Sequence, residues 1–286
     1  MRNIDDTSWK SLSGVRANKR ILQLVPNVEN FQSMLRCLKL WAKRRGVYET
    51  LLGYLGGVHL AILSAYVCLG HADASLNALI MIFFRTFASW PWPTTVMLHE
   101  RMYPSTADFI ETRSFMPIQL PSSPYEYCHS NITRSTFCRI KAEFIRGHAM
   151  TRDLLRPDFN WDSVFEPFPY SRKYSHFVKI YLSTLNQDEL GDWVGWVKSR
   201  LRGLLVKLEE VQGFCDPNPT EYVDADKTEP TVVFFWGLQP DENNLVDINL
   251  VEGEFLKSIS NGYEGSPGKM ELSIVLASQL PNNAQV

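Results

Sequence analysis

The sequence predicts an α+β protein in which a mostly helical first part is followed by a smaller α/β sandwich. Up to about residue 166, apolar residues recur at helical spacing in the runs 27–45, 56–69, 76–89 and 137–150. After residue 174, segments rich in β-branched and aromatic residues alternate with helical segments. The proline-containing segment 166–174 separates the two patterns. We therefore expect domains at 1–166 and 167–286.

The composition is that of an ordinary globular protein. The chain has 286 residues, of which 45% are hydrophobic and 21% charged, and this suits one large or two medium domains. Its net charge of −2 excludes a global attraction to nucleic acid, so any such surface must be a local patch. The five cysteines are scattered without Cys-x-x-Cys spacing, which argues against a zinc site or a disulfide scaffold.

One apolar stretch, 51–69, approaches the length of a membrane span, about 17–20 residues. Three glycines and His59 interrupt it, and the run at 79–84 is too short to pair with it. No secretory-type apolar segment follows Met1. We expect both runs to be buried core helices and the chain to have no membrane partner.

The helix expected at 27–45 has two distinct faces. Asn27 follows Pro26 and is suited to cap the first turn. The apolar face consists of Phe31, Met34, Leu35, Leu38, Trp41 and Ala42. A basic stripe, Arg36, Lys39 and Lys43, lies on another face at spacings of three and four. The helix is expected to end near Gly46.

Tyr48 and the pair Gly56-Gly57 follow this helix and precede the next one. Helix N-termini present free N–H groups that favour anions. A lysine, an aromatic ring and glycine-exposed N–H groups would together suit a nucleotide. Such a pattern is more often a solvated helix face followed by a turn, and the chain has no Walker-type loop (Gly-x-x-x-x-Gly-Lys-Ser/Thr). Both interpretations remain open on the pattern alone.

The second half predicts strands at 175–185, 231–239 and 270–280 and helices at 187–210 and 250–259. The order strand–helix–strand–strand–helix–strand fits a ferredoxin-like sandwich, the plan of RNA-recognition motifs. The aromatic signature of those motifs is absent. Phe234, Phe235 and Trp236 are therefore expected to be core rather than a base-stacking surface.

Several motifs occur in a collinear order that is specific as a set: SLSGVR (11–16), ILQLVPN (21–27), LRCLKLWAKRRGVY (35–48), GYLGGV (53–58), WPWPTTV (90–96), MPI (116–118), NITRST (131–136), WVGWVKSRLRGL (193–204) and NPTEYVD (218–224). This series resembles the eukaryotic nuclear poly(A) polymerases, most closely the plant forms. The resemblance covers the family's central domain and its RNA-binding domain, which is similar in topology to an RNA-recognition motif.

The resemblance implies a polynucleotide adenylyltransferase, a nucleotidyltransferase that adds AMP from ATP to RNA 3′ ends in mRNA polyadenylation. By the same resemblance, Lys39 would contact the ATP triphosphate, Tyr48 the nucleotide, and Gly57 and Val58 the adenine or ribose. Cleavage and polyadenylation factors are implied as partners. A nuclear location is implied, with the cytoplasm as the alternative. Thr50, Leu60 and Leu120 depart from the family's Asn, Trp and Thr at these positions, and Leu120 lacks the hydroxyl expected in the nucleotide wall.

In the family, three aspartates of an upstream palm domain hold two Mg²⁺ or Mn²⁺ ions. Only ten residues precede Ser11 here, so we expect no catalytic residue and no metal ligand in this sequence. Asp224 and Asp226 have the spacing of the family's Asp-x-Asp motif, and Gly265-Ser266 matches its Gly-Ser motif. Both lie in the second half of the chain and in the wrong order, so we do not expect them to bind metal. Asp5-Asp6 is an adjacent pair whose side chains would diverge on a strand.

Basic residues near the domain boundary and on the helix at 187–210 are the candidates for RNA contact: Arg172, Lys173, Lys179, Lys198, Arg200 and Arg202. Two classes of function follow from these observations. The chain is either part of a poly(A) polymerase, inactive alone, or a non-catalytic RNA-binding or scaffold protein derived from one.

Overall fold

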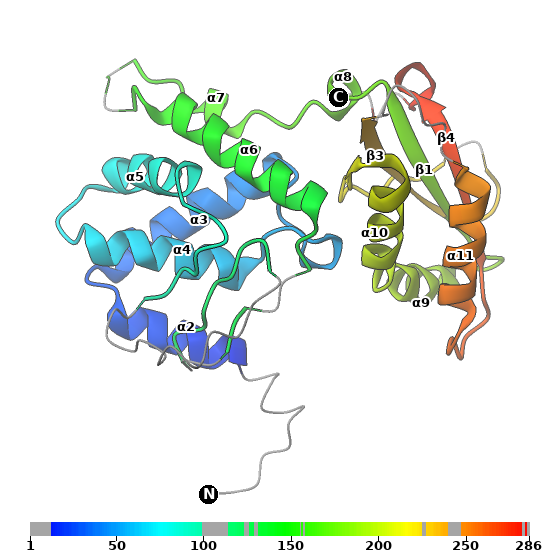
Figure 1. Cartoon of the computed structure of the whole chain (residues 1–286), viewed down its shortest axis with the longest axis horizontal. Helices are drawn as coiled ribbons and strands as arrows, with labels where there is room; N and C mark the ends of the chain where they lie inside the picture. The colour runs from blue at the N-terminus through cyan, green and yellow to red at the C-terminus, as the bar shows by residue number, and fades with distance from the viewer. Residues whose placement is uncertain are drawn as a thin grey trace, which may run out of the picture. The chain divides into compact units, whose positions relative to one another are not determined.

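The computed structural model describes residues 13–98, 114–122, 126–128, 131–154, 156, 158–224, 227–239, 247–281 and 284. The chain splits into two compact units. The first consists of Met1–Tyr48, Tyr54–Ile132 and Phe137–Glu166, and the second of Glu49–Gly53, Thr133–Thr136 and Pro167–Val286. Helices make up the first unit and a helix-covered sheet the second, which confirms the α+β class (Figure 1).

The helices of the first unit are α2 (Ser13–Leu24), α3 (Val28–Arg44), α4 (Gly57–Gly70), α5 (Leu76–Ala88), α6 (Arg134–Thr151) and α7 (Asp162–Phe165). The four apolar runs expected to be helical are α3 to α6. Helix α2 was not expected as a helix. Among its residues from Gly14 to Leu24, only Ala17 and Ile21 are buried, so its apolar stripe is too narrow to stand out in the sequence.

Helix α3 begins and ends as its sequence predicts. The side chain of Asn27 accepts a hydrogen bond from the backbone N–H of Asn30 at 2.9 Å. Gly46, two residues beyond the last helical residue, adopts a positive φ of 67°, which favours glycine. Trp41, in the last turn, is fully buried and packs with Phe84 and Phe144. Its burial anchors the stretch that leads to Tyr48.

Helix α4 is buried on nearly every side, which explains its unbroken apolar sequence. In the parts of the chain that the structure describes, no helix is long and apolar enough to cross a membrane. Most residues of the runs 51–69 and 79–84 are buried, as expected, but Leu51 is 41% exposed and α4 begins only at Gly57. The glycine at 147 on α6 permits close packing, because a Cβ there would overlap the ring of Phe84.

The elements of the second unit are η1 (Thr50–Leu52), α8 (Tyr170–Lys173), β1 (His176–Ser183), α9 (Gln187–Lys198), α10 (Leu201–Gln212), β2 (Phe214–Asp216), β3 (Thr231–Gln239), α11 (Ile248–Ser260), β4 (Lys269–Leu276) and η2 (Ala277–Gln279). The strands form an antiparallel sheet in the order β2-β3-β1-β4. This is the ferredoxin-like plan that the sequence predicted. Strand β2 has only three residues, too few for a periodic signal.

The prediction of a single helix at 187–210 is wrong, because this segment forms two helices, α9 and α10. The Ser199 hydroxyl donates to the Trp196 carbonyl at 2.6 Å. The Arg200 guanidinium lies 3.2 Å from the centroid of the Trp196 ring. These local contacts stabilise the turn without the proline or glycine that would have indicated it.

The sheet has two different faces, because successive side chains point to opposite sides. Phe177, Lys179 and Tyr181 of β1 share one face. There a cluster forms with residues that precede β1, that lie on β3 and that follow β4: Phe168, Tyr170, Tyr174, Val233, Phe235, Leu280 and Ala284. The cluster includes no residue of α9, α10 or α11, and α10 and α11 contact β2 and β4. These helices therefore cover the other face. Phe234 and Trp236 are fully buried and Phe235 is 5% exposed, so the prediction of core is confirmed.

Candidate nucleotide site and RNA-facing residues

Lys39, Tyr48 and Gly57 lie together in the first unit. Lys39 is on α3, and Gly57 is the first residue of α4. Between these helices the chain folds back on itself, because Tyr48 pairs with Leu55 in a short bridge and the Leu55 N–H donates to the Val47 carbonyl at 3.2 Å. This local pairing carries Tyr48 to the start of α4.

The absent side chain of Gly57 leaves a small cradle between the other two residues. A Cβ placed on Gly57 would lie 3.4 Å from Tyr48 Oη and 3.7 Å from both Cε and Nζ of Lys39. Tyr48, Lys39 and Gly57 are each partly exposed. A phenol hydroxyl and an ammonium group thus border a stretch of backbone that a ligand can approach closely.

The first turn of α4 adds the electrostatics of a helix N-terminus. The N–H groups of Gly57 and Val58 have no acceptor within the helix, as at the start of any α-helix. The preceding N–H of Gly56 donates to Nδ1 of His59 at 3.2 Å, inside the protein. Free N–H groups and the positive end of the helix dipole favour an anion at this point. With Lys39 Nζ beside them, the arrangement can bind a phosphate group.

Val58 lies toward α2. A Cβ on Gly14, near the start of α2, would be 3.9 Å from Val58 Cγ2. Helix α2 therefore borders the candidate site on the side of Val58. The sequence indicated the motif at 11–16 but not that it begins a helix beside this residue.

Lys43 also belongs to the candidate site, although the sequence indicated it only as part of the basic stripe on α3. Its Nζ lies 5.5 Å from the centroid of the Tyr48 ring, within reach of a cation–π interaction. Its position four residues after Lys39 places it on the same helix face, and this spacing could have indicated its role. Lys43 supplies a second cation on the wall that carries Tyr48.

A buried ion network fixes the end of α3 close to Tyr48. Arg45 binds Glu143 of α6 through Nε–Oε2 at 2.7 Å and Nη2–Oε1 at 2.9 Å. Arg139 Nη1 donates to Glu143 Oε1 at 2.9 Å, and Arg139 Nη2 donates to the Arg45 carbonyl at 2.8 Å. Because all three side chains are buried, this network holds the backbone at Arg45 rigidly.

Two departures from the family pattern are apolar side chains inside the protein. Leu60 is fully buried in α4, and Leu120 is 8% exposed. Thr50 is exposed and begins η1. The buried leucines offer no polar group to a ligand at these two positions.

The basic residues predicted to contact RNA do not form one cluster. Lys179 projects from the sheet face opposite α9–α11, where its Nζ lies 3.6 Å from Asp224 Oδ2. Lys198 of α9 pairs with Glu221 at 2.6 Å, and Arg200 stacks on Trp196. Arg172 and Lys173 of α8 and Arg202 of α10 are exposed. Lys179 therefore lies on a different face of the second unit from the basic residues of α9 and α10.

Within the described residues, no group of three or more His, Cys, Asp or Glu is arranged to hold a metal ion. Asp224 pairs with Lys179 instead, while Asp5, Asp6 and Asp226 lie outside the described residues. The residues present do not fit a two-metal centre, so no chemical step at a metal follows from this structure.

Four of the five cysteines, Cys37, Cys68, Cys128 and Cys215, do not offer a nucleophile, whereas Cys138 is exposed. All five are free thiols. Burial raises the pKa of Cys37 and of Cys68 to about 11 and that of Cys128 to about 12. Burial also raises the pKa of Cys215 well above its usual range. These thiols stay protonated at neutral pH and act as small core side chains.

The chain matches two family models between residues 30 and 230, and it matches known proteins over nearly its whole length. Residues 30–167 match the model described as "Poly(A) polymerase central domain", and residues 169–230 match "Poly(A) polymerase predicted RNA binding domain". The chain is 56% identical to Nuclear poly(A) polymerase 3 of Arabidopsis thaliana over 286 residues, which cover 100% of this chain and 56% of that relative.

More distant relatives match in the same way. Identity is 34% to Nuclear poly(A) polymerase 1 of Arabidopsis thaliana, over 99% of this chain and 42% of the relative. It is 31% to the Poly(A) polymerase of Dictyostelium discoideum, over 98% of this chain and 38% of the relative. The chain thus spans between 38% and 56% of the length of these three relatives.

Proposed function

Because the chain belongs to the poly(A) polymerase family, we propose that it provides the ATP-facing wall and the RNA-binding module of a polynucleotide adenylyltransferase. The reaction of that enzyme adds AMP from ATP to the 3′ end of an RNA. In this proposal residues 1–166 bind the nucleotide and residues 167–286 bind RNA. The nucleus is the proposed location, since the Arabidopsis relatives carry nuclear in their names.

The observation that carries the proposal is the convergence of Lys39 and Tyr48 on Gly57. These three residues come from separate segments, yet the fold places an ammonium, a phenol and an uncovered helix N-terminus within one small space. This set matches the parts of ATP: the ammonium and N–H groups match phosphate oxygens, and the ring and Val58 match the nucleoside.

The role assigned to this wall is to bind and orient ATP. Lys39 Nζ would neutralise phosphate charge while the N–H groups of Gly57 and Val58 donate to phosphate or ribose oxygens. Tyr48 would contact the nucleoside, with Lys43 Nζ 5.5 Å from the centroid of its ring. The positioning of a bound nucleotide accounts for much of the rate of phosphoryl-type transfer.

Titration of the chain with ATP, followed by NMR of the backbone amides, tests the proposal. The amide signals of Gly57 and Val58 should shift with millimolar or tighter affinity. Lys39→Ala should weaken that affinity by roughly ten-fold, the loss of one charge-assisted contact. Lys141→Ala, which removes an exposed lysine of α6, is the matched control and should leave the titration unchanged. Unshifted Gly57 and Val58 signals at saturating ATP would contradict the proposal.

A second candidate function is a non-catalytic RNA-binding or scaffold protein. The match of residues 169–230 to an RNA-binding domain model is compatible with it as well. Under either function, the 286-residue polypeptide alone should leave an oligo(A) primer unextended in the presence of ATP and Mg²⁺ or Mn²⁺. Metal-dependent extension by the purified polypeptide would refute that expectation. RNA binding without any ATP response would select the second candidate.

A further inference from the structure

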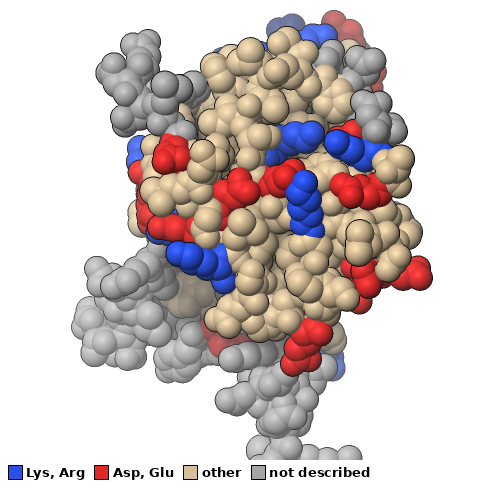
Figure 2. Space-filling model, turned by 90° about the vertical axis from the view of Figure 1, so that its right-hand side faces the viewer, with Lys and Arg blue, Asp and Glu red and all other residues tan. Residues whose placement is uncertain are grey.

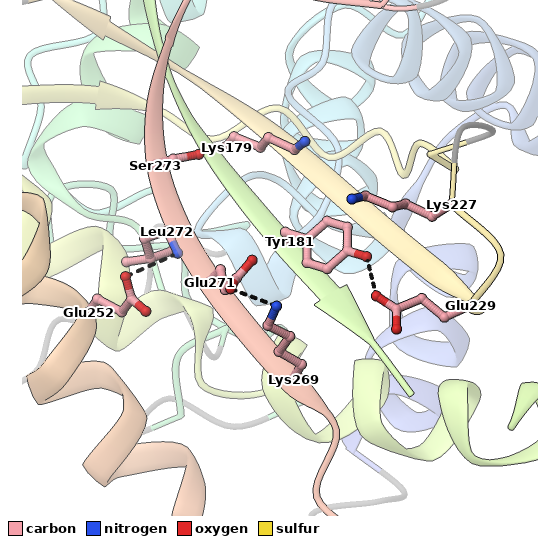
Figure 3. A pocket seen from close by; sticks show the side chains of 9 residues that line it. All are labelled: Lys179, Tyr181, Lys227, Glu229, Glu252, Lys269, Glu271, Leu272 and Ser273. Atoms are coloured by element: carbon pink, nitrogen blue, oxygen red, sulfur yellow. Dashed lines mark hydrogen bonds and ion pairs between the residues drawn. The ribbon is translucent and has the colours of Figure 1, made fainter. Parts of the chain in front are cut away.

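A pocket of about 390 Å³ lies mainly on the face of the sheet opposite α9–α11 and extends past the edge strand β4 to Glu252 of α11. Its volume falls within the range of roughly 300–1,000 Å³ typical of small-ligand sites. The charged side chains that line it are Lys179, Lys227, Lys269, Glu229, Glu252 and Glu271 (Figure 3). The sheet residue at its floor, Tyr181, is only 6% exposed. The pocket is therefore polar and charged, with no exposed ring on which a base could stack.

Each carboxylate of the pocket already has a donor. Glu271 pairs with Lys269 at 2.7 Å, and Glu229 accepts the Tyr181 hydroxyl at 2.7 Å. Glu252 accepts the Leu272 backbone N–H at 3.4 Å. A carboxylate has about four lone-pair positions, so Glu229 and Glu271 can each accept further hydrogen bonds.

Lys179 is held more loosely than Lys269. Lys179 Nζ lies 3.6 Å from Asp224 Oδ2, well beyond the roughly 2.7–2.9 Å of a charge-assisted hydrogen bond. Figure 3 shows the ammonium groups of Lys179 and Lys227 pointing toward one another beside the Tyr181 ring. An ammonium has three donors. Two such groups facing a common space can share an anion.

Lys179 and Lys227 thus face a common space beside Tyr181, while Glu229 and the Lys269–Glu271 pair line the rest of the pocket. This arrangement can take a phosphate at the two lysines and hydroxyl groups at the two carboxylates. We propose that the pocket binds one ribonucleotide unit, with its phosphate between Lys179 and Lys227 and its ribose hydroxyls directed to Glu229 and Glu271. The base is left toward solvent, so the site reads the sugar–phosphate backbone and not the base.

Such a unit is available from an RNA strand or from a free nucleotide. The inference rests on the proposed function in taking RNA as the ligand of the second unit. On the face shown in Figure 2, basic side chains lie among acidic ones and form no continuous basic patch. One pocket that neutralises one phosphate should then contribute about −0.7 to the slope of log K against log salt concentration.

The test measures binding of a fluorescent oligo(A) RNA, of the DNA with the same sequence, and of AMP. The full chain is compared with Lys227→Ala and with Lys179→Ala/Lys227→Ala. The double variant should bind RNA roughly ten-fold more weakly and lose about 0.7 from its salt slope. Lys207→Ala is the control, since Lys207 is exposed on α10 and pairs with Glu210 and Glu254. It should leave RNA affinity unchanged, and DNA should bind more weakly than RNA.

The outcomes separate this inference from the proposed function. If the chain binds RNA and the double variant binds it equally well, the pocket is refuted and the proposed function stands. If RNA does not bind but AMP does, and Lys227→Ala weakens AMP binding, the pocket stands as a free-nucleotide site. If neither RNA nor AMP binds, both ideas are refuted. DNA and RNA of equal affinity would refute the assignment of Glu229 and Glu271 to ribose hydroxyls. Lys227 is exposed, so its single variant tests the pocket without disturbing the fold.

Discussion

Arg45 and Glu143 form a bidentate ion pair inside the first unit, with both side chains only 4% exposed. Glu143 also neutralises Arg139, so one carboxylate serves two guanidinium groups. Breaking a buried pair from one side typically costs more than the pair contributes, because a buried charge loses its counter-charge. The pair therefore controls whether the backbone between Arg45 and Tyr48 stays ordered.

Glu143→Ala should lower the free energy of unfolding by about 3–5 kcal/mol, since it removes the carboxylate that balances two buried cations. Urea denaturation followed by tryptophan fluorescence measures the loss. Glu210→Ala, at an exposed position of α10, should change it by no more than about 0.5 kcal/mol. A cost near that of the control would show that the network contributes little to stability.

Gly57→Ala separates binding from folding at the candidate nucleotide site. The new Cβ would lie 3.4 Å from Tyr48 Oη, an ordinary contact, and Gly57 has no positive φ that would strain an alanine. The melting temperature should hold or rise slightly, since alanine is the better helix former. ATP affinity should fall, because the methyl group fills the cradle beside Lys39. Unchanged ATP affinity in a normally folded Gly57→Ala protein would show that ATP does not bind against the backbone at Gly57.

The stability that Tyr181 provides should disappear at alkaline pH. Burial, and then the hydrogen bond to Glu229, raise the pKa of Tyr181 from its ordinary value near 10 to about 12. The folded state thus holds the phenol proton more tightly than the unfolded state. The contribution is complete below pH 10 and is lost as the pH rises toward 12. Melting temperatures of the wild type and Tyr181→Phe, compared from pH 8 to pH 11.5, should converge as the pH increases. A constant difference across this range would argue against the raised pKa.

Gly237→Ala should destabilise the second unit. A Cβ at Gly237 of β3 would overlap the ring of Tyr174, whose hydroxyl donates to Asp216 at 2.7 Å inside the protein. Overpacking of this kind costs about 1–3 kcal/mol. Gly191→Ala is the matched control, since nothing lies within 4 Å of the new Cβ on α9. It should stabilise the helix by about 0.5–1 kcal/mol. Similar melting temperatures for the two variants would contradict the packing argument.

The sequence predicted those features that local patterns encode. The cap at Asn27, the end of α3 near Gly46 and the burial of Phe234 and Trp236 follow from residue type and spacing within one segment. The break at Ser199-Arg200 escaped prediction because a tryptophan–arginine stack replaces the usual glycine or proline.

Contacts between residues that are distant in the sequence could not be predicted from local patterns. The pairing of Arg45 with Glu143 spans 98 positions, and that of Tyr181 with Glu229 spans 48. Such pairs depend on how helices and strands are brought together, which no window of the sequence records. For the same reason the resemblance suggested Lys39, Tyr48 and Gly57 as a set, whereas the position of Lys43 over Tyr48 required the structure.

The second unit includes Thr133–Thr136, more than thirty positions before its main segment begins. Glu209 accepts hydrogen bonds there from the Thr133 hydroxyl at 2.6 Å and from the Ser135 N–H at 2.8 Å. The Ser135 hydroxyl in turn accepts from the Cys215 N–H at 3.1 Å. A fragment cut at Pro167 would lose these partners and leave a buried N–H without an acceptor. Residues 167–286 expressed alone are therefore expected to be less stable than the same residues within the full chain.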